Sequence, residues 1–217
     1  MLSRPLLLGH RGARSTKSIP ENTFASFDQA LTDGCDGFEF DVRLTADGQA
    51  VVVHDPQRRG VEVARATAQE VSWLPRLQDV LERYRDSAFL DIELKVHGLE
   101  PMIPSLFRKF APSRGFVVSS FLPEVLRSVR RESLSIPLGL ICETKPQLGE
   151  WGQSPVEYVI PHHRLVSAEL LRELREAGKK IIVWTVNDLA SMRRFAKAGV
   201  HGIISDDAKL LGESLRR

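Results

Sequence analysis

The stretch Gly37–Val42, GFEFDV, alternates apolar and acidic residues, and Phe89–Lys95, FLDIELK, repeats the pattern later in the chain. Successive side chains of a strand point to opposite faces, so Glu39 and Asp41 share one face of the first stretch. Glu93 has the equivalent position in the second stretch. The other face of each stretch is apolar. We therefore expect two strands that pack against helices on one side and present acids on the other.

Both stretches belong to a rhythm in which short apolar runs alternate with longer amphipathic ones. Strands with apolar residues on both faces, separated by helices, indicate a parallel sheet. About eight such units favour an α/β fold of the closed (β/α)8 type, a TIM barrel, over an open doubly wound sheet. The expected strands span residues 5–9, 37–42, 50–54, 89–95, 115–119, 137–142, 157–161, 180–185 and 201–205. The expected helices span residues 22–32, 77–85, 98–110, 123–132, 167–177 and 188–198, with a short final helix.

The composition fits a single globular domain over residues 1–217. Hydrophobic residues make up 42% of the chain and charged residues 27%, which leaves enough apolar side chain for a sizeable core. The formal net charge of +2 is too small to indicate nucleic acid or an anionic membrane as a global partner. No apolar run approaches the roughly 20 residues that span a bilayer, so we expect no transmembrane segment.

The two cysteines, Cys35 and Cys142, lie far apart and outside any CxxC pattern. They indicate neither a disulfide framework nor a structural zinc site. Met1–His10 lacks the basic and long apolar regions of a signal peptide. A cytoplasmic location is the simplest expectation, and a homodimer stays open.

Polar side chains gather where the expected strands end. The carboxyl ends of the strands form the rim of a barrel that carries the catalytic site. Segments far apart in the chain therefore deliver polar groups to one rim. The residues at the ends of the early strands are His10, Arg11, Glu39, Asp41, His54, Asp55, Glu93 and Lys95.

The acids at this rim are candidate metal ligands. Carboxylates aimed into a barrel mouth cannot stay ionised there without a partner. Glu39, Asp41 and Glu93 offer the hard oxygen ligands that suit one divalent cation, Mg²⁺ or Ca²⁺, with Mn²⁺ also open. The alternative is a structural ion network in which the acids pair with Arg11, Arg43 and Lys95.

The two histidines are candidates for proton transfer. Imidazole titrates near neutral pH, so one of His10 and His54 can accept a proton while the other donates one. Arg11 can hold a phosphate through two N–H groups. Asp55 either orients His54 or caps the turn that follows.

Pro20–Thr23, PENT, precedes the first expected helix. We expect Asn22 to cap that helix. In a second, functional interpretation, Glu21 or Asn22 braces the active site by holding His10 or Arg11.

The order and spacing of these motifs resemble the glycerophosphodiester phosphodiesterase family over nearly the whole chain. Each string is weak alone, and the combination is specific. The matching strings are His10–Ala13 (HRGA), Pro20–Thr23 (PENT), Phe38–Val42 (FEFDV), Thr45–Gly48 (TADG), Val53–Pro56 (VHDP), Glu93–Lys95 (ELK), Trp184–Asn187 (WTVN) and Gly199–Asp206 (GVHGIISD).

The resemblance implies a barrel that binds one divalent cation and hydrolyses small glycerophosphodiesters to sn-glycerol 3-phosphate and an alcohol. The implied roles are metal ligands for Glu39, Asp41 and Glu93, the acid–base pair for His10 and His54, and phosphate contacts for Arg11 and Lys95. Trp184, near the end of the expected strand 180–185, is interpreted as an apolar wall for the glycerol, with a place in the barrel core as the alternative. His162 and His163, next to the end of the expected strand 157–161, are expected to be structural or exposed.

The stretch after His54 is shorter than is usual in that family. Residues 56–76 carry Arg58, Arg59 and Arg65 but few aromatic residues, and we expect a reduced insertion there. A more open site would leave the preferred alcohol undecided. The alternatives on the same catalytic frame are a lysophospholipase D-like enzyme and one that releases a cyclic phosphate. A non-catalytic phosphoester-binding module would need a broken catalytic set.

Overall fold

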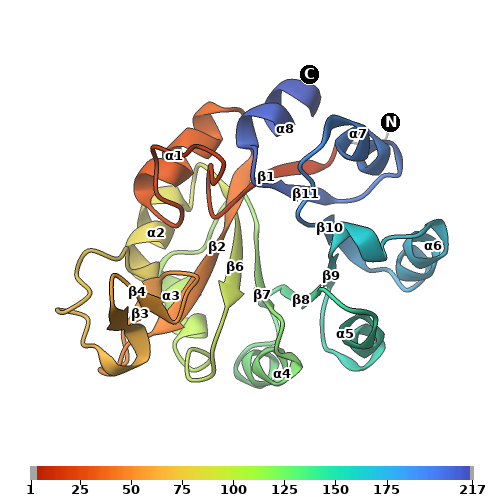
Figure 1. Ribbon diagram of the computed structural model, residues 1–217. Coiled ribbons are helices and arrows are strands. Elements are labelled where there is room, and N and C mark those ends of the chain that lie inside the picture. Colours follow the sequence, from red (N-terminus) through yellow and green to blue (C-terminus); the bar gives the residue numbers. More distant parts are fainter. Residues whose placement is uncertain (1–3, 216–217) are drawn as a thin grey trace.

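The first and last strands of the chain pair in parallel, and this pairing closes a barrel. A computed structural model describes residues 4–215 and places the strands in a ring with helices outside it (Figure 1). Leu7 lies opposite Ile203, and His10 on the other side of the same strand lies opposite Glu39. The expected (β/α)8 fold is confirmed. The barrel strands are β1 (Leu6–His10), β2 (Gly37–Leu44), β6 (Phe89–Leu94), β7 (Phe116–Ser120), β8 (Leu138–Cys142), β9 (Tyr158–Pro161), β10 (Lys180–Val183) and β11 (Gly202–Ser205).

A helix follows each barrel strand and covers the outside of the ring (Figure 1). Ser167 caps α6 as expected, since its side chain accepts a hydrogen bond from the Leu170 N–H at 3.2 Å. Helix α5 was not expected, and α3 begins later than expected. No helix in residues 4–215 combines the length and apolar character that crossing a membrane requires. The helices are α1 (Phe24–Thr32), α2 (Leu77–Tyr84), α3 (Ile103–Lys109), α4 (Pro123–Glu132), α5 (Lys145–Gly149), α6 (Ala168–Glu176), α7 (Leu189–Lys197) and α8 (Ala208–Leu215), with 3-10 turns at Val63–Arg65, Glu150–Gln153 and His163–Leu165.

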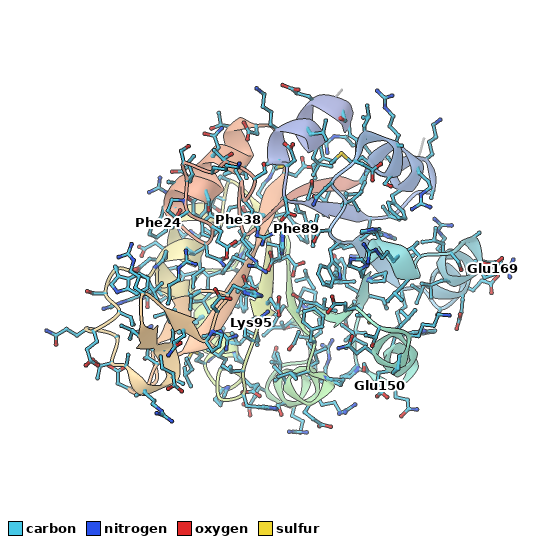
Figure 2. The ribbon with its side chains drawn as sticks, in the orientation of Figure 1. Phe24, Phe38, Phe89, Lys95, Glu150 and Glu169 are labelled. Atoms are coloured by element: carbon cyan, nitrogen blue, oxygen red, sulfur yellow. The ribbon has the colours of Figure 1, made fainter. Side chains whose placement is uncertain are left out.

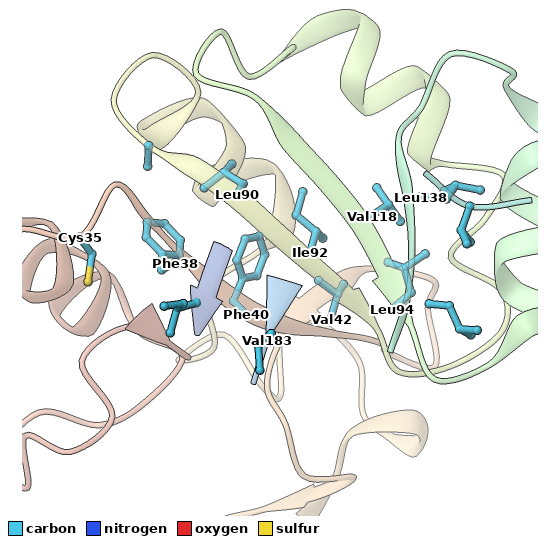
Figure 3. Packing of buried hydrophobic residues seen from close by; sticks show 14 of the residues in the cluster. Cys35, Phe38, Phe40, Val42, Leu90, Ile92, Leu94, Val118, Leu138 and Val183 are labelled. Atoms are coloured by element: carbon cyan, nitrogen blue, oxygen red, sulfur yellow. The ribbon is translucent and has the colours of Figure 1, made fainter. Parts of the chain in front are cut away.

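The strands separate two hydrophobic layers. The outer layer fills the space between the strands and the helices, and it buries the apolar faces of β2 and β6. A smaller layer inside the barrel includes Leu8, Val117 and Ile182. Alternation along β2 and β6 therefore leaves Glu39, Asp41 and Glu93 on the side away from the helices. Figure 3 shows the outer faces of the two strands side by side, with Phe38, Phe40 and Val42 paired to Leu90, Ile92 and Leu94.

The expected strand 50–54 is not part of the barrel ring. Its core, β3 (Ala50–Val52), runs antiparallel to the end of β2, so Val42 lies opposite Val52. A tight turn reverses the chain at Asp47–Gly48, where Gly48 adopts a φ of 79° that favours glycine. The hairpin carries His54 back over the rim from the end of β2.

Residues 56–76 form an ordered cap on this hairpin. They contain a small β-ribbon of β4 (Gln57–Arg58) and β5 (Val61–Glu62), followed by a 3-10 turn. Val63 and Val71 of this segment pack with Val51 and Val53 in a separate hydrophobic cluster. The segment with the poorest sequence pattern thus has its own small core beside the rim.

Candidate active site

The polar residues expected at the rim converge on one pocket of about 410 Å³. Figure 2 shows Lys95 beside the ends of β2 and β6, whereas Glu150 and Glu169 lie at the periphery of the molecule. Asp41 is buried just behind the pocket wall, where it contacts Lys95. The pocket is lined by His10, Arg11, Glu39, His54, Asp91, Glu93, Lys95, Phe121, Ile141, Glu143, Ile160, Trp184 and Ile204.

Three buried carboxylates lie together at the floor of the pocket, where Glu39 and Glu93 line it and Asp41 lies just behind them. Glu39, Asp41 and Glu93 each offer an oxygen, and these oxygens lie within 4.8 Å of one another. Oε1 of Glu39 and Oδ1 of Asp41 are buried without a hydrogen-bond partner. Buried acceptors without donors are unfavourable, and a hard divalent cation prefers such oxygens. The residues present therefore fit a divalent cation.

The protonation of these acids reflects their crowding. Burial, followed by the charges of Asp41 and Glu93, raises the pKa of Glu39 well above its ordinary value. Burial also raises the pKa of Glu93 to about 8. Burial acts on Asp41 in the same direction, but the charges of Lys95 and Arg11 outweigh it and lower the pKa of Asp41. Without a cation, the site holds less than its full negative charge at neutral pH.

Two basic side chains face this floor. Lys95 Nζ lies 2.7 Å from Oε1 of Glu93 and 3.3 Å from Oδ1 of Asp41. Arg11 Nε lies 3.3 Å from Oδ2 of Asp41, without hydrogen-bond geometry. Both cations line the pocket, so a bound phosphate can contact them from the open side.

The loop after β1 places Arg11 by a strained turn. Arg11 has a φ of 52°, and its backbone N–H donates to Oε2 of Glu39 at 3.0 Å. Gly12 follows at a φ of 82°, and a Cβ there would lie 2.5 Å from Oγ of Ser26. Glu21 accepts from Nη1 of Arg11 at 3.0 Å. The predicted brace by Glu21 on Arg11 is confirmed.

Asn22 does not cap α1, and that prediction is wrong. Thr23 caps the helix instead, in a reciprocal capping box with Ser26. Asn22 is buried at a φ of 57°, and its Nδ2 donates to Oδ2 of Asp41 at 2.8 Å. Its Oδ1 accepts from the Asp41 backbone N–H at 3.3 Å. Asn22 thus braces a candidate metal ligand rather than a helix end.

His10 is held by an acid that the sequence did not reveal as functional. Nδ1 of His10 lies 2.6 Å from Oδ1 of Asp206, directly after β11. The hydrogen bond from His10 and its charge outweigh burial and lower the pKa of Asp206, so this carboxylate accepts the Nδ1 proton. Asn187 and Arg14 hold Asp206 at 2.7 Å and 2.9 Å. Asp206 is the last residue of the matching string GVHGIISD. Its position directly after a strand could have indicated a place at the rim.

His54 is oriented in a similar way. Its Nδ1 lies 2.8 Å from Oδ1 of Asp55, and its backbone oxygen accepts from Nε of Arg43 at 2.7 Å. The bond to Asp55 supports the orienting role over a purely capping one. Burial lowers the pKa of His54, against the raising effects of Asp41 and Asp55. The bond to Asp55 leaves Nε2 of His54 free to act.

One wall of the pocket is apolar. Trp184 follows β10, and its Nε1–H donates to the Ile160 oxygen at 3.0 Å, which fixes the ring. Its ring meets Phe121 edge to face with centroids 5.6 Å apart. His162 lies against Trp184 and, like His163, does not line the pocket. The pocket thus has charged side chains on one side and the indole of Trp184 on the other.

The comparison with known families agrees with this geometry. The model of the glycerophosphoryl diester phosphodiesterase family matches residues 10–80 and 94–210. The chain belongs to that family. It is accordingly a phosphoric diester hydrolase, and its fold and rim motifs are those of the glycerophosphodiester phosphodiesterases.

Individual relatives cover nearly the full length. The chain is 30% identical over 243 aligned residues to a glycerophosphodiester phosphodiesterase of Caldanaerobacter subterraneus, covering 99% of each. The crystal structure of a glycerophosphodiester phosphodiesterase from Agrobacterium tumefaciens superposes with a TM-score of 0.82 at 25% identity, covering 96% of this chain and 99% of that one. An Oleispira antarctica phosphodiesterase in complex with the product sn-glycerol-3-phosphate gives a TM-score of 0.84 at 22% identity, covering 99% and 98%.

Proposed function

We propose that the chain hydrolyses glycerophosphodiesters to sn-glycerol 3-phosphate and an alcohol, with one divalent cation and two histidines. The observation that carries the proposal is the pair of histidines that line one pocket. Each imidazole is hydrogen-bonded at Nδ1 to a carboxylate, and three buried acids cluster beside them. The product bound to the Oleispira antarctica phosphodiesterase supports the choice of substrate.

Glu39, Asp41 and Glu93 would hold the cation. When bound, it would polarise phosphate oxygens and neutralise charge at phosphorus. Mg²⁺ and Ca²⁺ both suit an all-carboxylate set, and Mn²⁺ is the third candidate.

Arg11 and Lys95 are the side chains that contact the phosphate directly. Arg11 is anchored by Glu21, so its guanidinium is oriented before substrate binds. Lys95 lies partly buried between Glu93 and Asp41, and the charges of these acids outweigh burial and raise its pKa, so it stays cationic. Trp184 covers the apolar face of the glycerol.

The histidines move the protons. The carboxylate on each Nδ1 keeps that nitrogen protonated and leaves Nε2 as the reactive atom. One Nε2 accepts the proton of the attacking oxygen, which belongs to water or to the neighbouring glycerol hydroxyl. The other, which must be protonated on both nitrogens when the substrate binds, donates its Nε2 proton to the departing alkoxide. Attack by the hydroxyl would form a cyclic phosphate that water then opens.

Single His10→Ala and His54→Ala variants test this scheme with glycerophosphocholine. We expect each to lose at least about 10²-fold in kcat, the lower end of what a general acid or base contributes. Phosphorus NMR of the products distinguishes direct hydrolysis from release of a cyclic phosphate, and a lysophospholipid assay tests the lysophospholipase D-like alternative. Near-native turnover by either variant contradicts the two-histidine scheme.

The cytoplasmic location and the homodimer remain predictions. Cys35 and Cys142 are both free and buried, in accord with a reducing compartment.

A further inference from the structure

A second, smaller cleft of about 80 Å³ adjoins the active-site pocket. The two cavities share His54, which lies between them. On its far side the cleft is bounded by the cap of residues 56–76, through Arg58, Arg59 and Trp73. A diester bound at the rim has two arms on phosphorus, and this cleft lies where the arm nearest His54 would leave the main pocket.

Arg59 occupies a backbone position that arginine does not favour. It lies at the tip of the β4–β5 ribbon with a φ of 52°, followed by Gly60 at 77°. Two successive left-handed residues make the turn type in which Asn or Asp followed by Gly is preferred. An arginine there costs roughly 1 kcal/mol of backbone strain. A residue kept at such a position calls for a role of its side chain.

The side chain of Arg59 is positioned by an aromatic ring. Its guanidinium lies 4.4 Å from the centroid of the Trp73 ring. Stacking on the indole leaves the N–H groups at the edge of the guanidinium free to donate. Both residues line the cleft, so this edge is available to a ligand in it.

The acids near the cleft are engaged elsewhere. Glu21 is hydrogen-bonded to Arg11 and Arg14. Asp55 is hydrogen-bonded to His54 and lies 3.9 Å from Nη1 of Arg58, beyond hydrogen-bond length.

Arg59 has no such neighbour. Within residues 4–215, no carboxylate oxygen lies within 4.0 Å of its guanidinium nitrogens. Glu62, on the facing strand of the ribbon, pairs with Arg65 at 3.1 Å. Glu21 also lines the cleft but is bonded to Arg11 and Arg14, and Arg58 has Asp55 at 3.9 Å. Among residues 4–215, Arg59 is therefore the cleft cation that is left without a carboxylate.

We propose that Arg58 and Arg59 form a subsite for a second anionic group on the alcohol part of the diester. The substrate class is a glycerophosphodiester whose leaving alcohol carries a phosphate or carboxylate. The inference rests on the proposed function, because it requires the alcohol arm of the same diester, rather than its glycerol arm, to lie beside His54. The phosphate or carboxylate accepts hydrogen bonds from both guanidinium groups, and a quaternary ammonium there would be repelled.

The test compares glycerophosphoglycerol with its analogue phosphorylated on the terminal hydroxyl, and with glycerophosphocholine. We expect kcat/KM of the unaltered protein to favour the phosphorylated substrate over glycerophosphoglycerol by about tenfold, the value of one charge-assisted hydrogen bond. Raising the salt concentration reduces this ratio. The ratio falls to about one in the Arg58→Gln/Arg59→Gln double variant.

Matched variants distinguish the loss of a charge in the cleft from a general change in the structure of the cap. Arg65→Gln removes a charge from the same cap, at a side chain that is 83% exposed and lines neither cavity, so its ratio stays unchanged. Arg59→Lys keeps the charge without the stacked planar group and retains an intermediate ratio. Thermal unfolding confirms that each variant is folded.

Two failures are distinguishable. If no diester is hydrolysed, the proposed function fails and the subsite with it. If all three are hydrolysed without preference for the phosphorylated head group, or if the double variant lowers all three rates equally, the subsite alone is overturned.

Discussion

Asp206 accepts a hydrogen bond from Nδ1 of His10 at 2.6 Å, although 196 positions of chain separate them. The pair joins the last barrel strand to the first at the rim. Since an ionised carboxylate can only accept, the bond fixes the proton on Nδ1 and directs Nε2 towards the pocket.

Replacing Asp206 with asparagine should therefore lower kcat far more than it changes KM. An amide can present either a donor or an acceptor to Nδ1, so the imidazole is no longer held in one tautomer. We expect a loss of about 10²-fold in kcat, measured with glycerophosphocholine. Asp207→Asn is the control, because Asp207 accepts from the Leu210 N–H in α8 and does not contact His10. Equal losses in both variants would contradict the positioning role.

Binding of the cation should release protons near neutral pH. The pKa of Glu93 is raised to about 8 by burial, and a carboxylate must be ionised to act as a ligand. Mg²⁺ affinity should rise between pH 6 and pH 8. Calorimetry in two buffers of different ionisation enthalpy measures the protons released. Binding without proton release would show that Glu93 is already ionised.

The raised pKa of Glu93 also makes the stability of the metal-free protein depend on pH. The folded pKa of Glu93 lies above its ordinary value of 4.5, so its contribution is fully present below about pH 4.5 and is lost as pH rises through about 8. We expect the melting temperature in EDTA to fall across this window and Mg²⁺ to restore it most at the alkaline end. Glu93→Gln should flatten the curve, and an unchanged slope in that variant would assign the effect to another group.

Gly12→Ala should destabilise the protein more than Gly48→Ala. Both glycines have positive φ, of 82° and 79°, so alanine costs roughly 1–2 kcal/mol at either. At position 12 the new Cβ also meets the backbone of Ser26 at 2.6 Å, whereas at position 48 nothing lies within 4 Å. We expect a further loss of about 1–3 kcal/mol for Gly12→Ala from overpacking, measured by urea unfolding. Equal losses would show that the loop relaxes freely.

Trp184→Ala should raise KM with a much smaller effect on kcat. An apolar wall contacts the glycerol in the ground state and in the transition state alike, so its loss weakens both equally. Trp184→Phe keeps an aromatic surface beside Phe121 and should retain most of the affinity. A loss confined to kcat would place Trp184 in the chemistry instead.

Local patterns predicted the barrel and the clustering of the three acids well. Alternation in GFEFDV and FLDIELK is a local property, and it correctly placed Glu39, Asp41 and Glu93 away from the outer core. The capped helix α6 was likewise set by neighbouring residues, through Ser167.

The sequence failed to predict features that depend on contacts between distant segments of the chain. The run 50–54 is apolar enough for a parallel strand, and only the Asp47–Gly48 turn before it indicates a hairpin. Asn22 is a good helix cap by type, but its bond to Asp41 depends on a strand that comes later in the chain. Asp206 gains its role only because β11 returns to β1.

The pairing of β11 with β1 determines when the site can be completed during synthesis of the chain. A nascent chain that has left the ribosome up to β10 already contains both histidines and all three candidate metal ligands. It still lacks Asp206, and the edge of β1 that β11 will cover is open. Completion of the site therefore requires β11 to pair with β1, so that activity reports a closed ring.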